Sequence, residues 1–515
     1  MEPATFADIV RQQAASRPQA PALTYDGATW SFAQLHAYSS QSANALRAAG
    51  VGAGDRVALL TKNQAECYEL LFATSKIGAI LVGLNWRLAA AEISAIVADA
   101  QPTVVIVGAS EQALLTDAAR TTPGLRRVVI LGPEYTAWRA AAPSADPGYM
   151  GQPDDVAMLL YTSGTTGLPK GVMLTNHGMA FTRRLGAEAW GMGPDSVNLV
   201  AMPMFHIGGS GYGMSTVAVG GHTVLMREVN TAQAIMLIQK HRVTHTFFVP
   251  TVVQSLLQVP GVAEADLSSM QLLMYGAAPI GDVLLRSAIA VLGCRFMQAY
   301  GMTETSGTVV VLDPADHEPD GERARLLSSC GRALPWVELR IIDPTTLQDA
   351  ATGSVGEIWI RSGMVMKGYW NNPTASAEAL MPGGWLRTGD AAYQDVQGYV
   401  YLFDRFKDMI ISGGENVFPA EVENALNAHP ALLEAAVIGV PHARWGETPR
   451  AIVVLRPGLQ VQEQELIAFV RERLARYKCP NSVVFTDTLP RNASGKLLKR
   501  ELRRTHGQEA GHDGG

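Results

Sequence analysis

Cysteine is scarce in this sequence, and its few copies are scattered. The 515-residue chain contains 4 cysteines, none of them in a CxxC pair: Cys67, Cys294, Cys330 and Cys479. A disulfide framework or a cysteine-type zinc site needs a denser or more closely spaced set. The sequence therefore favours a protein of a reducing compartment, and we expect a cytoplasmic localisation.

Long apolar runs are also missing. The opening segment, Met1 to Gln12, has no charged stretch followed by an apolar one. No run of about 18 apolar residues, the length that a membrane-spanning helix requires, follows later. We therefore expect no signal peptide and no integral membrane segment, while peripheral association with a membrane stays open.

Charge of one sign does not dominate either. The 41 Lys+Arg against 47 Asp+Glu give a net charge of −6, which excludes a strongly basic nucleic-acid binder as the default, so we expect no nucleic-acid partner. With 17% charged and 47% hydrophobic residues the chain is globular and not disordered. At roughly 150 residues per domain, its length suggests about three domains.

Short β-branched runs alternate with amphipathic helical stretches through most of the chain. Arg56 to Leu60 predicts a strand, Ala65 to Lys76 a helix and Ile80 to Leu84 a strand. The same rhythm predicts strands at 103–107, 128–131, 197–201, 223–226, 246–249 and 272–275, and helices at 231–241 and 281–292. This alternation indicates an α/β protein whose large N-terminal body consists of doubly wound βαβ sheets.

The pattern changes in the last third of the chain. Short strands between turns, at 337–342, 356–361 and 398–403, predict a β-rich subdomain. A compact α+β unit follows, with helices expected at 419–428 and 463–477 and strands at 435–440, 451–455 and 483–486. We divide the chain into an N-terminal domain 1–403, a hinge 404–408, a small mobile α+β cap 409–504 and a disordered tail 505–515.

The strongest local signal follows an expected strand at Met158 to Tyr161. It is the run Thr162-Ser163-Gly164-Thr165-Thr166-Gly167-Leu168-Pro169-Lys170-Gly171. Glycines allow successive N–H groups to point at one anion, the hydroxyls add donors and the lysine adds positive charge. The run predicts a phosphate-binding loop, although it does not match the GxxxxGK[ST] pattern.

Further segments in the same order form a constellation. They are Tyr275-Gly276-Ala277-Ala278-Pro279, Tyr300-Gly301-Met302-Thr303-Glu304, Thr388-Gly389-Asp390, Asp404-Arg405-Phe406-Lys407-Asp408 and Pro490-Arg491-Asn492-Ala493-Ser494-Gly495-Lys496. Taken singly, Glu304, Asp390 or Lys496 is typical of a solvated surface residue. In this register, and from about Ala22 to Arg500, the chain resembles the adenylate-forming (ANL) superfamily and, within it, the acyl-CoA synthetase or fatty-acid–CoA ligase branch.

The resemblance implies an ATP-binding site. The loop 162–171 is expected to hold the β- and γ-phosphates through Thr162, Ser163, Gly164, Thr165, Thr166, Gly167 and Lys170. Glu304 and the Thr162 hydroxyl are the expected Mg²⁺ ligands, Thr303 is expected to donate to the α-phosphate, and Gly301 is expected to contact ATP or AMP. Gly276, Ala277, Ala278 and Tyr300 are expected around adenine, with Asp390 on the ribose hydroxyls and Arg405 on the ribose and the phosphates. Lys496 is expected on the acyl carboxylate and the α-phosphate, which makes it, with Glu304, His206 and Lys170, a catalytic candidate.

The resemblance also implies a second step with CoA. In the family the C-terminal unit rotates about a hinge, here Lys407, and brings a glycine-rich segment, here Ser412-Gly413-Gly414, to the pantetheine path. Residues 471–504 contain ten Lys/Arg against three Asp/Glu, which is typical either of a solvated helix face or of a patch that meets ATP or CoA phosphates.

His206 bears on the choice of acid. A lone histidine is often structural, but in this position CoA ligases of the family carry a histidine, whereas domains that activate amino acids carry an aspartate. His206, with Gly208 and the apolar Phe247, Val249 and Val252, therefore favours a plain carboxylic acid. A fatty acid is the leading substrate, and aryl or alicyclic acids are the alternatives.

Four interpretations stay open. The first is an acyl-CoA synthetase that uses ATP, CoA and a small carboxylic acid. The second is a ligase that stops at the acyl adenylate or loads a carrier protein. The third is a luciferase-like oxygenase, and the fourth is a binding protein that has lost catalysis, against which the presence of Glu304, Asp390, Arg405 and Lys496 argues. The oligomeric state also stays open, with a homodimer among the alternatives.

Overall fold

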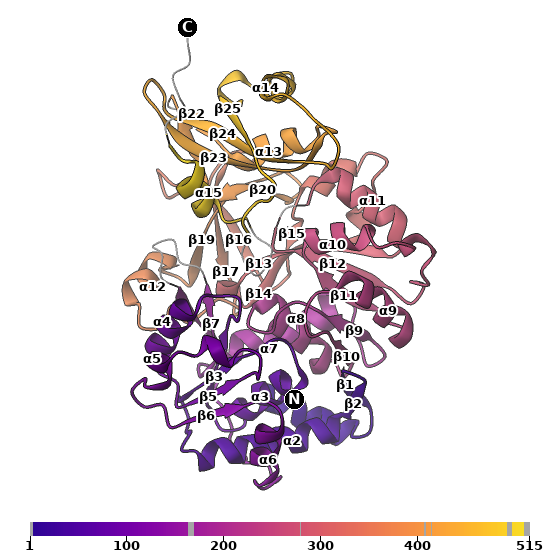
Figure 1. The fold of residues 1–515 in the computed structure, drawn as a ribbon, viewed down its shortest axis with the longest axis vertical. Coiled ribbons are helices and arrows are strands. Elements are labelled where there is room, and N and C mark those ends of the chain that lie inside the picture. Colours follow the sequence, from indigo (N-terminus) through magenta and orange to yellow (C-terminus); the bar gives the residue numbers. More distant parts are fainter. Residues whose placement is uncertain are drawn as a thin grey trace.

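The computed structural model describes residues 4–162, 169–278, 280–405, 408–413, 415–491 and 497–508. Figure 1 shows two mostly parallel sheets with their helices in the lower part of the molecule and the C-terminal sheet at the top. The expected doubly wound body and the smaller C-terminal unit are confirmed.

The larger of the two parallel sheets has nine strands, and six neighbours in its centre run parallel. Their order is β15 (Arg332–Ala333), β14 (Gly307–Leu312), β13 (Arg295–Met302), β12 (Leu272–Gly276), β11 (His245–Phe248), β9 (Val197–Val200), β10 (His222–Leu225), β1 (Pro21–Tyr25) and β2 (Ala28–Ser31).

The second sheet has six strands in the order β6 (Arg127–Ile130), β5 (Val104–Val107), β3 (Arg56–Leu60), β4 (Ile80–Leu84), β7 (Val156–Thr162) and β8 (Lys170–Thr175). All its neighbours are parallel except β7 and β8. Every residue of β5, Val-Val-Ile-Val, is buried, as expected for a parallel strand covered on both faces.

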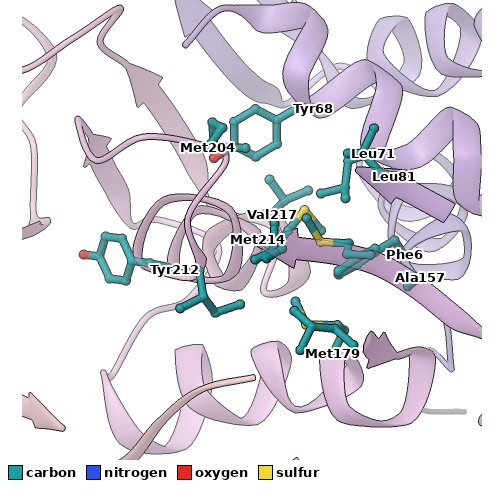
Figure 2. Close-up of a cluster of buried hydrophobic side chains, with 14 of the residues drawn as sticks. Phe6, Tyr68, Leu71, Leu81, Ala157, Met179, Met204, Tyr212, Met214 and Val217 are labelled. Atoms are coloured by element: carbon teal, nitrogen blue, oxygen red, sulfur yellow. The ribbon is translucent and has the colours of Figure 1, made fainter. Parts of the chain in front are cut away.

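Helices cover both sheets and fill the space between them. In the N-terminal body they are α1 (Phe6–Ser16), α2 (Phe32–Ala48), α3 (Ala65–Ser75), α4 (Ala90–Ala100), α5 (Asp117–Arg120), α6 (Pro133–Ala140), α7 (Asn176–Arg184), α8 (Ile207–Ala218), α9 (Thr231–His241), α10 (Pro250–Leu257) and α11 (Asp282–Leu292). Phe6, Tyr68, Leu71, Met179 and Met214, from α1, α3, α7 and α8, lie in one hydrophobic cluster (Figure 2). The same cluster contains residues of both parallel sheets, so the two sheets share a core.

The expected β-rich region is an antiparallel sheet of five strands, β16 (Glu338–Ile342), β17 (Gly356–Arg361), β18 (Leu380–Met381), β19 (Trp385–Gln394) and β20 (Val400–Arg405), with α12 (Pro373–Ala379) between β17 and β18. Ile358 and Ile360 of β17 belong to the shared core. The sheet therefore packs on the N-terminal body.

The C-terminal sheet contains β22 (Glu415–Val417), β21 (Ile410–Ser412), β24 (Gly446–Leu455), β23 (Leu432–His442) and β25 (Ser482–Phe485). The helices of this unit are α13 (Pro419–Asn427), α14 (Glu463–Arg471) and α15 (Lys499–His506). Its hydrophobic clusters consist of residues between Ile410 and Leu502, so this part of the chain has cores of its own.

Two expectations about the C-terminal unit are wrong. The helix predicted at 463–477 ends at Arg471. The chain turns at residues 472–473 and forms a separate 3₁₀ turn, Arg476–Lys478, which brings buried Cys479 into the same core as Leu466. The tail predicted to be disordered from residue 505 begins too early. Thr505 and His506 belong to α15, where the Arg450 guanidinium donates to the His506 carbonyl oxygen at 2.6 Å.

Within the described ranges, no helix has the length and apolar character needed to cross a membrane.

Candidate active site

The expected phosphate-binding loop connects two antiparallel strands. Thr162, the last residue of β7, is paired with Lys170, the first residue of β8. Ser163, Gly164, Thr165, Thr166 and Gly167 lie outside the described residues. The first hydroxyl residue and the lysine of the motif are therefore cross-strand neighbours on the two strands of one hairpin.

Tyr369 joins this hairpin to Glu304. Its hydroxyl donates to Glu304 Oε1 at 3.0 Å, and Lys170 Nζ lies over its ring, 5.0 Å from the ring centroid. The backbone around Tyr369 runs along β8, where the Trp370 N–H donates to the Gly171 carbonyl oxygen at 2.7 Å. One side chain thus contacts the candidate phosphate-binding cation and the candidate metal-binding carboxylate.

Sequence reasoning missed Tyr369. The residue lies about two hundred positions from Lys170, and nothing in Lys367-Gly368-Tyr369-Trp370 distinguishes it from an ordinary turn and strand. Only the pairing of this segment with β8 places Tyr369 at the site, and that pairing is a tertiary contact that the local sequence does not indicate.

Thr303 and Glu304 lie in a short 3₁₀ turn directly after β13. They are only 5% and 6% exposed. A carboxylate so buried needs partners, and Tyr369 supplies one. The turn thus presents an acid at the end of a central strand, beside the hairpin.

The donor set suits a magnesium ion held mainly by phosphates. In the described part of the chain no group of three or more His, Cys, Asp or Glu side chains could hold a metal. Mg²⁺ in nucleotide sites is bound through one or two protein carboxylates and the substrate phosphates. Glu304 together with the Thr162 hydroxyl fits that requirement.

A second hydrogen bond brings two other motifs together. The Tyr300 hydroxyl donates to Asp390 Oδ2 at 2.8 Å, joining β13 to β19. Burial, together with the Asp390 carboxylate, raises the pKa of Tyr300 well above its usual value, so the phenol stays protonated and can donate. Asp390 is also paired with Arg405 across β19 and β20, as its backbone shows.

Small residues are required where β12 and β13 end. A Cβ on Gly276 would lie 2.1 Å from the Ala299 carbonyl oxygen, and one on Gly301 2.0 Å from that of Gly307. Ala277 has φ +64°, a left-handed conformation that non-glycine residues adopt rarely and that clusters at functional sites. Ala278 continues this turn, and Pro279 lies outside the described residues.

His206 caps the N-terminus of α8. Its Nδ1 accepts a hydrogen bond from the Gly208 N–H at 3.1 Å, which leaves the proton of a neutral ring on Nε2. Burial lowers the pKa of His206 to about 4, so the ring is uncharged at neutral pH. The loop before it is fixed by Asn63, whose side chain bonds the Met202 carbonyl oxygen and the Met204 N–H.

The candidate CoA segment follows β21. Ser412 is buried, and Gly413 has φ +61° and donates its N–H to the Trp445 carbonyl oxygen at 2.9 Å. A Cβ on Gly413 would lie 2.8 Å from the Trp445 ring, which is 43% exposed. Gly414, Lys407 and Lys496 lie outside the described residues.

The basic stretch 471–504 is less positive in space than in sequence. Lys478 pairs with Glu421 at 2.8 Å, Lys499 with Glu423 at 3.0 Å and Arg503 with Asp408 at 2.8 Å. Arg491 pairs with Glu434. Acidic residues between Asp408 and Glu434 thus neutralise part of the basic excess. This weakens the interpretation of the stretch as a patch that faces ATP or CoA phosphates.

The hairpin, the buried acid beside it and the Tyr300–Asp390 pair lie in an α/β fold and are consistent with an enzyme that binds a nucleotide. The chain belongs to the AMP-binding enzyme family, whose model matches residues 10–370, and the AMP-binding enzyme C-terminal domain matches residues 421–496.

Known relatives match over nearly their whole length. A fatty acid–[acyl-carrier-protein] ligase, ScoC of Streptomyces coeruleorubidus, is 40% identical over 97% of this chain and 96% of its own. A feruloyl-CoA synthase from an Amycolatopsis species is 40% identical over 96% and 98%. The crystal structure of ATP-bound MatB from Rhodopseudomonas palustris, 33% identical, superposes with a TM-score of 0.90 over 97% of this chain and 99% of that one.

These matches confirm the resemblance found in the sequence. The protein is an AMP-forming acid–thiol ligase, which activates a carboxylic acid as an acyl adenylate and passes the acyl group to a thiol.

Proposed function

We propose that the protein is a Mg²⁺-dependent acyl-CoA synthetase that takes free CoA as the acceptor. The observation that carries this proposal is the contact of Tyr369 with both Glu304 and Lys170. A cation and a carboxylate held side by side suit a substrate composed of phosphates and Mg²⁺.

In the first half-reaction a carboxylate oxygen of the acid attacks the α-phosphorus of ATP, and pyrophosphate leaves. Both reactants are anions, so positive charge must lie close to them. Lys170 binds the β- and γ-phosphates, Thr303 donates to the α-phosphate, and Lys496 neutralises the carboxylate and the α-phosphate. Glu304 and Thr162 hold Mg²⁺, which supplies charge neutralisation at the departing pyrophosphate.

The nucleoside lies against the ends of β12 and β13. The adenine base lies beside Tyr300, next to Gly276, Ala277 and Ala278, and Gly301 also contacts the nucleotide. Asp390 accepts from the ribose hydroxyls, and its orientation is fixed by the Tyr300 hydroxyl at 2.8 Å. Arg405 contacts the ribose and the phosphates.

The acid lies next to His206. Its neutral ring offers no negative charge to a substrate ammonium group, which favours a plain acid over an amino acid. Phe247 lies close by, since a Cβ on Gly208 would be 3.3 Å from both the Phe247 ring and His206 Nδ1. A fatty acid is the leading substrate class, and an aryl or alicyclic acid is the alternative.

The second half-reaction uses the C-terminal unit, residues 409–504, turned about the hinge 404–408 at Lys407. Ser412, Gly413 and Gly414 then line the path of the pantetheine arm, with the exposed Trp445 ring packed on Gly413. Separate hydrophobic cores in this unit support such a rigid-body turn.

Lys496→Ala should abolish adenylate formation and spare thioester formation from supplied acyl adenylate, because Lys496 serves only the first half-reaction. An equal loss in both half-reactions would contradict the assignment.

The function is tested by pyrophosphate release with a panel of fatty, aryl and alicyclic acids, with free CoA, with a phosphopantetheinylated carrier protein, or with neither. We expect ATP- and Mg²⁺-dependent release with at least one acid, and a CoA thioester as the product. Acylation of the carrier protein alone would replace CoA by a protein acceptor, as the name of ScoC suggests for that relative. If none of the tested acids supported pyrophosphate release, the proposal would be contradicted.

A further inference from the structure

Three aromatic rings form a row at the side of α8. Tyr212 of α8 lies between Phe247 of β11, at 5.7 Å between ring centroids, and Trp190, at 5.1 Å. All three side chains are buried, at 5%, 7% and 4% exposed respectively. Figure 2 shows Tyr212 pointing away from Met214 and Val217 of the same helix, although all three belong to the shared core.

The row carries two polar atoms that are unsatisfied in the described part of the chain. Tyr212 Oη and Trp190 Nε1 are buried and have no hydrogen-bond partner among the described residues. Leaving a buried donor or acceptor unpaired costs about 1–3 kcal/mol, and most such atoms in folded proteins are paired. The Trp190 backbone is satisfied in contrast, since its carbonyl oxygen contacts His245 Nε2 at 3.2 Å.

The row begins at the candidate acyl site. Gly208 lies against both His206 and Phe247, because its Cβ would be 3.3 Å from each. Gly208 and Tyr212 are four residues apart on α8 and so lie on the same face of the helix, one turn apart. Phe247 therefore connects the two: it lies beside Gly208 and His206 on one side and contacts Tyr212 on the other, and Tyr212 contacts Trp190.

We infer that Tyr212 and Trp190 determine specificity, by recognising an oxygen atom at the end of the acid remote from its carboxylate. The inference rests on the proposed function and narrows its substrate class. An indole N–H can only donate, and a phenol can donate or accept, so the matching group is an acceptor oxygen such as a phenol, methoxy, keto or hydroxyl oxygen. An oxygen-bearing aryl or alicyclic acid, or an oxygenated chain, is favoured over an unsubstituted alkyl chain.

The test compares pairs of acids that differ by one remote oxygen. Suitable pairs are 4-hydroxycinnamate with cinnamate, 4-methoxyphenylpropanoate with phenylpropanoate, and 10-hydroxydecanoate with decanoate. We expect wild-type kcat/KM for adenylation to be at least about 10-fold higher for the oxygenated member of one pair, since sites built around a hydrogen bond discriminate strongly against analogues that lack it. Tyr212→Phe and Trp190→Phe should each reduce that ratio by about 10-fold.

Tyr135→Phe is the matched control. The Tyr135 side chain is also fully buried, but it belongs to α6, and its hydroxyl is hydrogen-bonded to Ser42 and Glu69. Its removal should leave the ratio unchanged. A wild-type enzyme that prefers the unsubstituted acid in every pair, or ratios that Tyr212→Phe and Trp190→Phe leave unchanged, would overturn this inference alone. Absence of pyrophosphate release with every acid would overturn the proposed function and this inference with it.

Discussion

At the triphosphate end of the site, two opposite charges depend on one aromatic side chain. The Tyr369 hydroxyl orients Glu304, and its ring face holds the Lys170 ammonium group at 5.0 Å from the centroid. The two contacts are separable, because the hydroxyl can be removed without the ring. Tyr369 is in this sense a positioning residue: in the proposed function it acts through Glu304 and Lys170.

Tyr369→Phe should weaken the binding of MgATP and its use in adenylation. A hydrogen bond to a charged group contributes about 1.5–3 kcal/mol, so kcat/KM for ATP in pyrophosphate exchange should fall about 10- to 100-fold. Tyr369→Leu should lose a further factor of about 2 to 5, since a cation–π contact contributes about 0.5–1 kcal/mol. Titration of MgATP binding by calorimetry measures the effect without turnover.

The matched measurement uses supplied acyl adenylate. Thioester formation from it should be unaffected in Tyr369→Phe, because that step involves neither pyrophosphate nor its metal. An equal fall in both half-reactions, or an unchanged affinity for MgATP, would show that Tyr369 contributes only to folding.

At the scale of elements, the site is built where strand ends come together. β13 leads into the turn with Thr303 and Glu304, β12 ends at Gly276, and β19 brings Asp390 to Tyr300 of β13. The closeness of β12 to β13 is what makes Gly276 necessary, because its Cβ would lie 2.1 Å from the Ala299 carbonyl oxygen. That contact is with backbone, so no side-chain rotation relieves it.

Gly276→Ala should therefore disturb the nucleotide site. Overpacking a rigid position typically costs about 1–3 kcal/mol of stability, and we expect a loss in that range. The shift of the strand end should also reduce ATP affinity by about 10-fold or more. Gly193→Ala is the control, since a Cβ there meets nothing within 4 Å. Thermal melting and ATP binding measured on both variants decide the matter; equal behaviour of the two would contradict the role given to Gly276.

Much of this arrangement could be predicted from the sequence. The strands β3, β4 and β17 and the helix α9 begin and end where the hydrophobic pattern places them, because each is a local run bounded by turns. The motif residues Tyr300, Glu304 and Asp390 were identified by their register. Tyr369, Tyr212 and Trp190 were not, since their importance comes from neighbours far away in the sequence. The ion pairs of Lys478 with Glu421 and of Lys499 with Glu423 could not be predicted for the same reason.

At the scale of the whole molecule, folding keeps several buried or half-buried histidines neutral. Burial lowers the pKa of His206, His222, His245 and His317 to about 4 in each case. They belong to the N-terminal body, and two of them, His222 and His245, are the first residues of β10 and β11 in the nine-stranded sheet. Their ordinary pKa is about 6.5, so unfolding exposes them to protonation below that value.

Stability should therefore fall as the pH decreases from about 6.5 towards 4, because in this window the unfolded chain binds more protons than the folded one. Above about pH 7 these groups are neutral in both states and contribute no pH dependence. At pH 5.5, calorimetry in buffers of different ionisation enthalpy should show the uptake of at least about three protons on unfolding. Unfolding without proton uptake at that pH would contradict the burial of these side chains.

In the proposed reaction the carboxylate of the acid becomes bonded to the α-phosphorus of ATP. An acid labelled with ¹⁸O in its carboxylate tests it directly. The attacking oxygen bridges carbon and phosphorus in the acyl adenylate, and the thiol then displaces AMP from the carbonyl carbon. We predict that one ¹⁸O atom from the acid appears in the phosphate group of AMP for each thioester formed, as detected by mass spectrometry. Label in inorganic phosphate, with ADP as the other product, would contradict it.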